Sequence, residues 1–423
     1  MVEIWLPYGK TKVSVKVPEE NFKGAIETKD DDVVKNLASH VERSLQKPIC
    51  SRPLRSMVKT GERAVLVIEG TVRSTIVNDL VAPVIMELIG AGLRPEEITV
   101  LFGTNMQGST RVQQILQVGE TELLSRLKIL SHNCRSKDHV RVGETSRGTG
   151  VFLNTMFAKA DVKILIGSVG LHPYAGYTGG RTGVLPGVSG EQTISHNHAL
   201  LVHVNAHPAV LNGNPVSEDM TEAAELAGVD FMVNAVLNRA GQTVRVFSGD
   251  LQKAFHSAST KVGDMCKVPC ESKVDIAVVS AGGSPEDATL CQSIESLCYA
   301  LDVVEDGGAI VLVAECSEGY GNQVFGQWME RFDKSRRLEQ EITKKFEIGG
   351  QYAYLLAKTL EKVRVYLVST IPDYYVSRVF RMRPGRTVTG ALQTSLRTIG
   401  KDSRVLVIPH GASTLPVLLE HKA

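Results

Sequence analysis

The feature that most constrains the fold is a series of short, β-branched apolar segments with room for a helix between them. Most are continuous apolar runs rather than alternating ones, which is typical of strands buried on both faces of a sheet. Strands that alternate with helices predict an α/β protein with mainly parallel sheets. The eight expected strands lie within residues 64–70, 97–105, 162–170, 230–238, 275–283, 308–316, 363–370 and 404–411.

Chain length and turn-forming segments indicate the domain organisation. A chain of 423 residues usually forms two or three domains. The segment 81–93 has apolar residues at helical spacing and Gly92 near its end, which predicts a helix. The turn-rich segment 262–273 is expected to separate two α/β domains.

Composition excludes several classes of protein. The net charge of +1 favours neither nucleic acid nor an anionic membrane as a partner. No apolar run approaches the ~18 residues that span a bilayer, and the first residues lack the apolar core of a signal peptide. Seven cysteines without a CxxC pair are typical of reduced thiols, so a cytoplasmic protein is expected. Association into a homo-oligomer stays open.

Several predicted strands are followed by polar or glycine-rich loops, and ligands of open α/β sheets bind at the carboxyl ends of strands. We therefore expect these loops to converge on one site. Their candidate residues are Arg73, Asn105, His172, Gln292 and Glu295.

The glycine-rich loop at 172–187 is similar to phosphate-binding loops but matches neither a P-loop nor a dinucleotide fingerprint. The backbone N–H groups of Gly179 and Gly180 could approach an anion closely, and Arg181 could add a forked contact. The alternative is a long flexible turn.

Four histidines fall within twelve residues: His196, His198, His203 and His207. On a continuous helix, His203 and His207 would be an i, i+4 pair able to ligate zinc. There is no HExxH motif, and Pro208 follows directly. The alternative is that these histidines are ordinary hydrogen-bonded residues.

Motifs along the whole chain resemble the lactate racemase family. They are "LPYGK" near the start, the loop from His172 to Gly180, "PGVSGEQTISHNHAL", "GNP" at 213–215, "SAGGSPEDATLCQ" and the final "STLPVLL". Members of that family are nickel-dependent racemases and epimerases of α-hydroxyacids. The resemblance implies an N-terminal α/β domain at 1–268, to which a strand at 404–423 returns, a smaller α/β domain at 274–403, and an active-site cleft between them.

The family's cofactor is a nickel pincer nucleotide, and its mechanism resembles reversible hydride transfer coupled to proton transfer. By resemblance, His172 is an acid/base residue and His198 is the nickel ligand. Arg73 would bind the substrate carboxylate, and Gln292 would line the substrate pocket. Asn105, Gly179, Gly180, Arg181 and Thr182 would surround the cofactor.

Four positions depart from the family pattern. Asn105 replaces a second acid/base histidine, and Thr182 replaces the lysine that bonds covalently to the cofactor. Glu295 replaces a substrate-binding lysine, and Gly70 replaces an aspartate, although Glu69 is adjacent. Threonine has no amine with which to form the linkage, and asparagine does not titrate near neutral pH.

These residues predict a racemase or epimerase that binds the nickel nucleotide without a covalent bond and acts on an α-hydroxyacid other than lactate. The alternative is a non-catalytic nucleotide- or anion-binding homologue that keeps the fold. A conventional nicotinamide dehydrogenase is disfavoured because its glycine fingerprint is missing.

Overall fold

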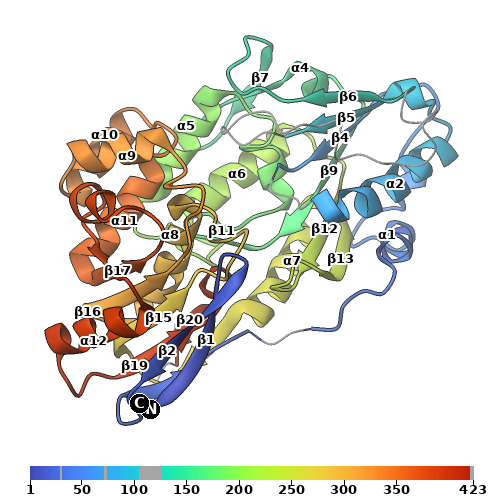
Figure 1. The fold of residues 1–423 in the computed structure, drawn as a ribbon. Coiled ribbons are helices and arrows are strands. Elements are labelled where there is room, and N and C mark those ends of the chain that lie inside the picture. The colour runs from blue at the N-terminus through green and yellow to red at the C-terminus, as the bar shows by residue number, and fades with distance from the viewer. Residues whose placement is uncertain (29–30, 71–73, 104–125, 420–423) are drawn as a thin grey trace. The chain divides into compact units, whose positions relative to one another are not determined.

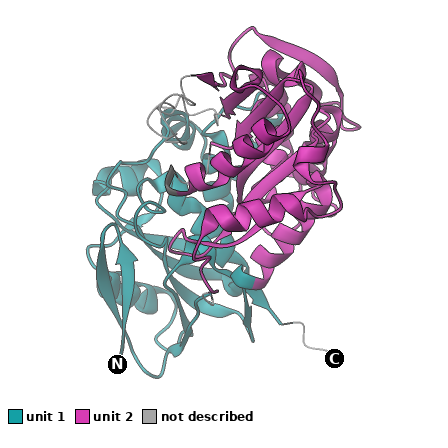
Figure 2. Ribbon diagram, turned by 90° about the vertical axis from the view of Figure 1, so that its right-hand side faces the viewer, with its two compact units in different colours: residues 1–29, 265–423 teal, residues 30–264 magenta. Residues whose placement is uncertain are grey.

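The computed structural model describes residues 1–28, 31–70, 74–103 and 126–419. They form two compact units: unit 1 contains residues 1–29 and 265–423, and unit 2 contains residues 30–264 (Figures 1 and 2). Each unit is built around a six-stranded sheet. Within the described residues, no helix is both long and apolar enough to cross a membrane, and all seven cysteines are free thiols.

The sheet of unit 2 has five parallel strands and one antiparallel edge strand. In spatial order its strands are β13 (Thr243–Gly249), β12 (Phe231–Leu237), β9 (Val162–Val169), β4 (Ala64–Ile68), β5 (Ile98–Phe102) and β6 (Lys128–Ser131). Its helices are α1 (Leu37–Gln46), α2 (Ser74–Gly90), α4 (Thr155–Ala158), α5 (Glu191–Ala199), α6 (Pro215–Leu226) and α7 (Leu251–Cys266), whose last residues belong to unit 1. Two hairpins complete it, β7 (His139–Glu144) with β8 (Gly150–Asn154), and β10 (Leu171–His172) with β11 (Gly176–Tyr177).

The sheet of unit 1 is wholly parallel. Its order is β18 (Arg383–Pro384), β17 (Arg364–Val368), β16 (Val304–Val313), β15 (Val274–Ser280), β19 (Val405–Ile408) and β3 (Phe22–Ala25). Its helices are α8 (Leu290–Ala300), α9 (Gln323–Arg331), α10 (Ser335–Lys344), α11 (Gly350–Lys362) and α12 (Val388–Ile399). Outside this sheet lie the hairpin of β1 (Val2–Tyr8) with β2 (Thr11–Val17) and the parallel pair β14 (Lys267–Cys270) and β20 (Leu415–Leu418).

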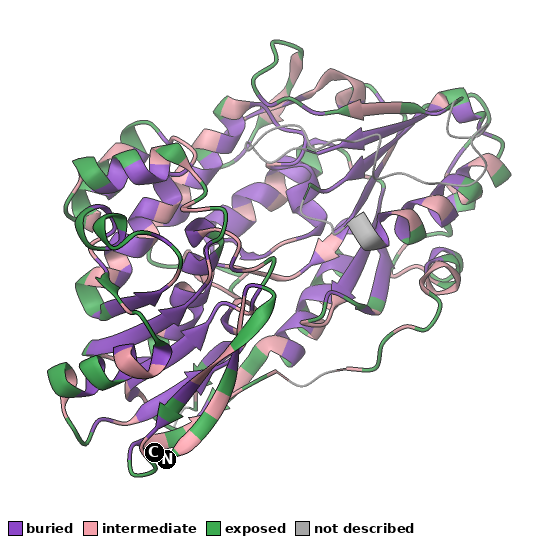
Figure 3. Ribbon diagram, viewed as in Figure 1, coloured by how far each residue is buried: buried purple, intermediate pink, exposed green. Residues whose placement is uncertain are grey.

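The fold-class prediction is confirmed, and each of the eight expected segments contains a strand. The continuous apolar runs are strands whose residues are almost all buried, as Figure 3 shows for the central strands. The predicted helix at 81–93 is the second half of α2, which ends at Gly90 before Gly92 adopts a φ of +106°. The apolar runs were sufficient to predict the strands because strands buried on both faces are continuously apolar.

The observed division of the chain differs from the expected domains 1–268 and 274–403. Residues 1–29 belong to unit 1, because β3 pairs with β19 and the hairpin buries Leu6, Val15 and Val17 in the core of the C-terminal sheet. The final strands β19 and β20 also belong to unit 1, where they pair with β15 and β14, instead of returning to the first domain. These pairings join residues between 129 and 383 positions apart, so no local pattern signals them.

Candidate functional site

The candidate site of unit 2 lies at the carboxyl edge of its parallel strands. Glu69 directly follows β4, Gly103 follows β5, and the glycine-rich loop follows β9. This edge is where open α/β sheets bind ligands. Arg73 and Asn105, which were predicted to contribute here, lie outside the described residues.

The glycine-rich loop is a packed element rather than a flexible turn. Almost every residue from Pro173 to Gly190 is buried. Gly176 has a φ of +79°, and a Cβ there would lie 2.2 Å from the carbonyl oxygen of Val210. Gly180 has a φ of +54°, and a Cβ there would lie 2.9 Å from the ring of Phe255. Only glycine allows such close approach, so these residues serve packing.

The backbone N–H groups of the loop are already hydrogen-bonded inside the protein. Gly179 donates to Thr182 Oγ1 at 2.8 Å, and Gly180 donates to the side-chain amide of Asn234 at 3.1 Å. The N–H of Thr182 donates to the carbonyl of Gly179 at 3.3 Å. This arrangement does not support the interpretation that Gly179 and Gly180 grip an anion through their backbone.

Arg181 lies beneath the loop and holds it together. Its Nη2 donates to the carbonyl oxygen of Ala175 at 3.0 Å and to Ser217 Oγ at 3.1 Å, and its guanidinium group lies 4.3 Å from the ring centroid of Phe255. Burial lowers the pKa of Arg181 to about 9, and the charge of Glu69 opposes that shift. Most of its donor capacity therefore serves the loop, although its Nη1 has no hydrogen-bond partner among the described residues.

Thr182 is joined to Glu69 by a buried hydrogen bond. Its hydroxyl donates a hydrogen bond to Glu69 Oε1 and accepts one from the N–H of Gly179, so it acts as both donor and acceptor. Thr182 is 6% exposed and Glu69 is 7% exposed. Burial raises the pKa of Glu69, while hydrogen bonds from Thr182, Gly179 and Ser168 favour the charged form.

Three aromatic rings bring the two principal histidines together. Tyr174 packs edge-on against His172, with ring centroids 4.4 Å apart, and its ring centroid lies 5.8 Å from that of His198. His172 comes from β10 and His198 from the last turn of α5. The prediction that these histidines share a site is consistent with this cluster.

A chain of buried hydrogen bonds orients the ring of His198. The side-chain Nδ2 of Asn197 donates to Asp219 Oδ2 at 2.9 Å and to the carbonyl of Val216 at 3.1 Å, which leaves Oδ1 facing His198. His198 Nδ1 lies 3.1 Å from that oxygen and must donate to it. The resulting tautomer has its lone pair on Nε2, the form that a metal-binding histidine requires.

Asp219 anchors this chain from α6. It is fully buried and accepts hydroxyl hydrogen bonds from Thr145 at 2.5 Å and Thr149 at 2.9 Å. Burial lowers the pKa of His198 to about 4, so the imidazole is neutral at pH 7. The sequence interpretation missed Asn197 and Asp219; the one available signal was Asn197 beside a candidate ligand in "SHNHAL".

His172 is neutral and is held in a defined orientation. Its Nδ1 accepts the N–H of Ala175 at 3.0 Å, which places the ring proton on Nε2. Burial, together with the charges of His198 and Arg181, lowers its pKa to about 3. Such a ring is a hydrogen-bond donor through Nε2, and it can accept a proton there only after changing tautomer.

The helical i, i+4 pairing expected for His203 and His207 is not formed. Helix α5 ends at Ala199 and is followed by a short 3-10 turn, so His203 and His207 do not share a helical face. His196 and His203 are exposed. Within the part of the chain that the structure describes, no group of three or more His, Cys, Asp or Glu side chains could hold a metal ion alone.

The two candidate substrate residues of unit 1 lie three positions apart on α8. Gln292 is exposed, and its Oε1 accepts from both the N–H and the hydroxyl of Thr289, forming the capping box that starts the helix. Glu295 is partly buried, and burial raises its pKa to about 7. Both follow the carboxyl end of β15, the expected ligand-binding edge of that sheet.

The fold and these side chains define a two-unit α/β protein in which two neutral, oriented histidines, His172 and His198, lie close together in unit 2. A family model described as "Lactate racemase N-terminal domain" matches residues 8–209, and one described as "Lactate racemase C-terminal domain" matches residues 270–416. The chain belongs to the lactate racemase family.

Similar proteins cover nearly the whole chain. A lactate racemase of Thermoanaerobacterium thermosaccharolyticum is 26% identical, with 98% of this chain and 99% of the relative covered. A lactate racemase of Lactiplantibacillus plantarum is 27% identical, with 98% and 100% covered. The structure of the T. thermosaccharolyticum lactate racemase apoprotein superposes with a TM-score of 0.89 over 99% of this chain and 100% of that one. A crystal structure of a Thermotoga maritima protein, 15% identical, shares the fold with a TM-score of 0.67 over 93% and 100%.

Proposed function

We propose that this protein is a racemase or epimerase of an α-hydroxyacid other than lactate, and that it uses a nickel pincer nucleotide bound without a covalent link. Family membership and two relatives named lactate racemase support the reaction class. The observation that carries the proposal is the buried His198, whose tautomer is set by Asn197 and Asp219.

The residues of unit 2 fit such a metal site. A pincer nucleotide brings most of the metal's donor atoms with it, so one protein histidine suffices, and a three-residue metal cluster is not required. Hydrogen bonding of the second ring nitrogen to an anchored partner is the usual support for a metal-binding histidine. His198 would hold the nickel, and when bound the group would supply a reversible hydride acceptor.

The attachment of the cofactor is expected to be non-covalent. Thr182 occupies the position of the family's linking lysine, and its hydroxyl is engaged by Gly179 and Glu69 beneath the loop. A buried hydroxyl that already donates one hydrogen bond and accepts another is a poor nucleophile. The loop 179–182 would therefore form a wall of the cofactor site rather than a point of attachment.

His172 would manage the proton on the substrate oxygen. In the observed tautomer, Nε2–H can donate to a carbonyl or hydroxyl oxygen, and the neutral ring adds no charge to the site. Removal of a hydroxyl proton by His172 requires the tautomer with its lone pair on Nε2 and so loss of the hydrogen bond from Ala175. In the resting protein His172 therefore serves as a hydrogen-bond donor to the substrate oxygen, and it becomes a base only after the change of tautomer.

Glu295 supports a substrate other than lactate. A carboxylate that replaces a substrate-binding lysine repels a second carboxylate and accepts hydrogen bonds from hydroxyl groups. A polyhydroxylated, sugar-derived hydroxyacid therefore suits the residue better than lactate does.

The decisive experiment is the nickel content of full-length protein made in a host that produces the cofactor. We expect His198→Ala to abolish nickel retention and His172→Ala to keep the nickel but to slow turnover by ~10²–10⁴. His196→Ala is the matched control, since that exposed histidine lies on the same helix. Equal nickel in the wild type and His198→Ala would refute the ligand assignment. Nucleotide binding without turnover of any hydroxyacid would instead favour the non-catalytic homologue.

A further inference from the structure

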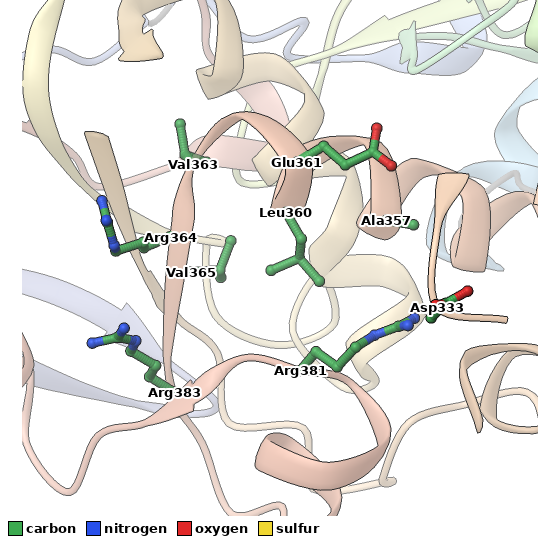
Figure 4. A pocket seen from close by; sticks show the side chains of 9 residues that line it. All are labelled: Asp333, Ala357, Leu360, Glu361, Val363, Arg364, Val365, Arg381 and Arg383. Atoms are coloured by element: carbon green, nitrogen blue, oxygen red, sulfur yellow. The ribbon is translucent and has the colours of Figure 1, made fainter. Parts of the chain in front are cut away.

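A pocket in unit 1 contains charged groups that do not converge on one position. It has a volume of about 340 Å³ and lies between the end of α11 and the start of β17 (Figure 4). Arg364 and Arg383 lie on one side of it, whereas Arg381 extends to the other side beside Asp333. Arg383 also donates to the hydroxyl of Tyr366 at 3.3 Å. These charges therefore do not define a ligand.

The β7–β8 turn of unit 2, residues 145–149, has the opposite arrangement, because its side chains converge on a single carboxyl group. Thr145 and Thr149 lie opposite each other at the two ends of the turn, and the N–H of Thr145 donates to the carbonyl of Thr149 at 3.0 Å. Gly148, with a φ of +77°, allows the chain to reverse between them. Both hydroxyl groups are then within hydrogen-bond distance of Asp219 on α6.

The carboxyl group of Asp219 accepts hydrogen bonds from three donors. Its Oδ1 accepts the hydroxyl of Thr145 at 2.5 Å, and its Oδ2 accepts the hydroxyl of Thr149 and the side-chain Nδ2 of Asn197, both at 2.9 Å. The hydroxyl oxygen of Thr145 already accepts the N–H of Thr149 at 3.2 Å, so its own proton is free for Asp219. Three donors fit an ionised carboxylate, which can only accept hydrogen bonds.

The charge of Asp219 is not neutralised by a cation. Although Asp219 is fully buried, it forms no ion pair with any residue that the structure describes. Arg147, the cation of the turn, pairs instead with Glu218 at 2.5 Å and with Glu222 at 3.4 Å. Glu222 also accepts the N–H and the hydroxyl of Ser146, at 2.6 Å each, so the turn is attached to α6 on a second, more exposed face. A buried carboxylate held only by neutral donors favours a positive charge nearby.

Asn197 transmits the orientation of Asp219 to His198. Its Nδ2 faces two acceptors, Asp219 Oδ2 and the carbonyl oxygen of Val216, so its Oδ1 faces His198 Nδ1 at 3.1 Å. The reversed amide would bring Oδ1 against both acceptors and Nδ2 against the imidazole. The carboxylate of Asp219 therefore favours the amide orientation that keeps the imidazole proton on Nδ1 and the lone pair on Nε2.

We propose that the β7–β8 turn is a positioning element of the His198 site. Thr145 and Thr149 hold Asp219 as a carboxylate, and that carboxylate holds the amide that keeps the lone pair of the imidazole on Nε2. The hydrogen bonds of the described residues carry this orientation, and its use to hold nickel rests on the proposed function. The charge of Asp219 has the sign that a cation at Nε2 requires. Because these residues act through Asn197 and His198, they are positioning residues and not catalytic ones.

The test is the tautomer of His198 in the full-length protein without cofactor, measured at pH 7 from the nitrogen chemical shifts of its ring, with His198→Gln to identify the signal. We expect the Nδ1–H form in the wild type. The double variant Thr145→Val, Thr149→Val keeps the side-chain shapes and removes both hydroxyl groups. A carboxylate that loses two of its three donors takes up a proton or turns away, and either change releases the amide. The tautomer ratio should therefore shift toward Nε2–H by at least about tenfold.

Two matched variants separate positioning from a structural role. Ser146→Ala removes a hydrogen bond from the same turn to Glu222, away from Asp219, and should leave the tautomer unchanged. Thr145→Ser, Thr149→Ser keeps both hydroxyl groups and should keep the wild-type tautomer ratio even if its melting temperature falls. If the double valine variant does not fold, Thr149→Val alone must shift the ratio in the same direction. The Nε2–H form in the wild type, a wild-type ratio in the valine variants, or an equal shift in Ser146→Ala would each overturn the proposal.

Nickel content distinguishes this proposal from the proposed function. In full-length protein made in a host that produces the cofactor, the double valine variant should bind nickel about 10–100-fold more weakly, the usual effect of losing an outer partner of a metal ligand. Equal nickel in the wild type and His198→Ala would refute the metal ligand and leave the tautomer result standing. An unchanged tautomer in the valine variant, with nickel that still depends on His198, would refute the role of the turn alone.

Discussion

Replacement of Thr182 by valine tests how the glycine-rich loop is held in place. Valine has nearly the same shape, so the substitution removes the hydroxyl without opening a large cavity. Two buried partners lose their hydrogen bond: the N–H of Gly179 and the carboxyl group of Glu69. An unsatisfied buried group costs roughly 1–3 kcal/mol, and the two together give about 3 kcal/mol.

That free energy predicts a change of about two orders of magnitude in the equilibrium for local opening of the loop, at ~1.4 kcal/mol per decade. The assay is hydrogen–deuterium exchange of peptides that cover residues 172–190, because global unfolding of a two-unit chain is not a single transition. Thr182→Ser is the matched control, since it keeps the hydroxyl. If Thr182→Val and Thr182→Ser exchange at the same rate as the wild type, the Thr182–Glu69 hydrogen bond does not hold the loop.

Three further predictions follow from single residues. Because Thr182 cannot form the family's linkage, intact-mass spectrometry of denatured holo-protein should show the bare chain, and an adduct within residues 179–187 would contradict this. Burial, and to a smaller extent the charge of His139, lowers the pKa of His132 to about 4. The neutral ring therefore makes its full contribution to the free energy of unfolding above pH 6.5, and this contribution falls as the pH drops toward 4. At pH 5 about 2 kcal/mol of the free energy of unfolding should be lost. His132→Gln should lack that part of the acid sensitivity in denaturant titrations. With a Glu295 pKa of about 7, Glu295→Gln should strengthen lactate binding at pH 8 more than at pH 6, and equal effects at both pH values would remove Glu295 from the substrate site.

The positions of the main strands could be predicted from the sequence, whereas the roles of His172 and His198 stay predictions. The strands β4, β9, β15 and β16 are buried on both faces, so each is a continuous apolar run that is visible in the sequence. His172 and His198 lie in ordered motifs whose spacing resembles a family. Those signals are local, because backbone periodicity and motif spacing are properties of neighbouring residues.

Which buried polar side chains hydrogen-bond to each other was decided only by the tertiary structure. Glu69 and Thr182 are 113 positions apart, and Asn197 and Asp219 are 22 apart on different helices, yet each pair shares a buried hydrogen bond. The glycines of the loop looked suited to an anion, but their N–H groups are taken by Thr182 and Asn234. Likewise, residues 22–25 pair with β19, which lies near the opposite end of the chain. A buried polar group must find a partner wherever the packed chain provides one, and that choice depends on distances in space that no spacing along the sequence contains.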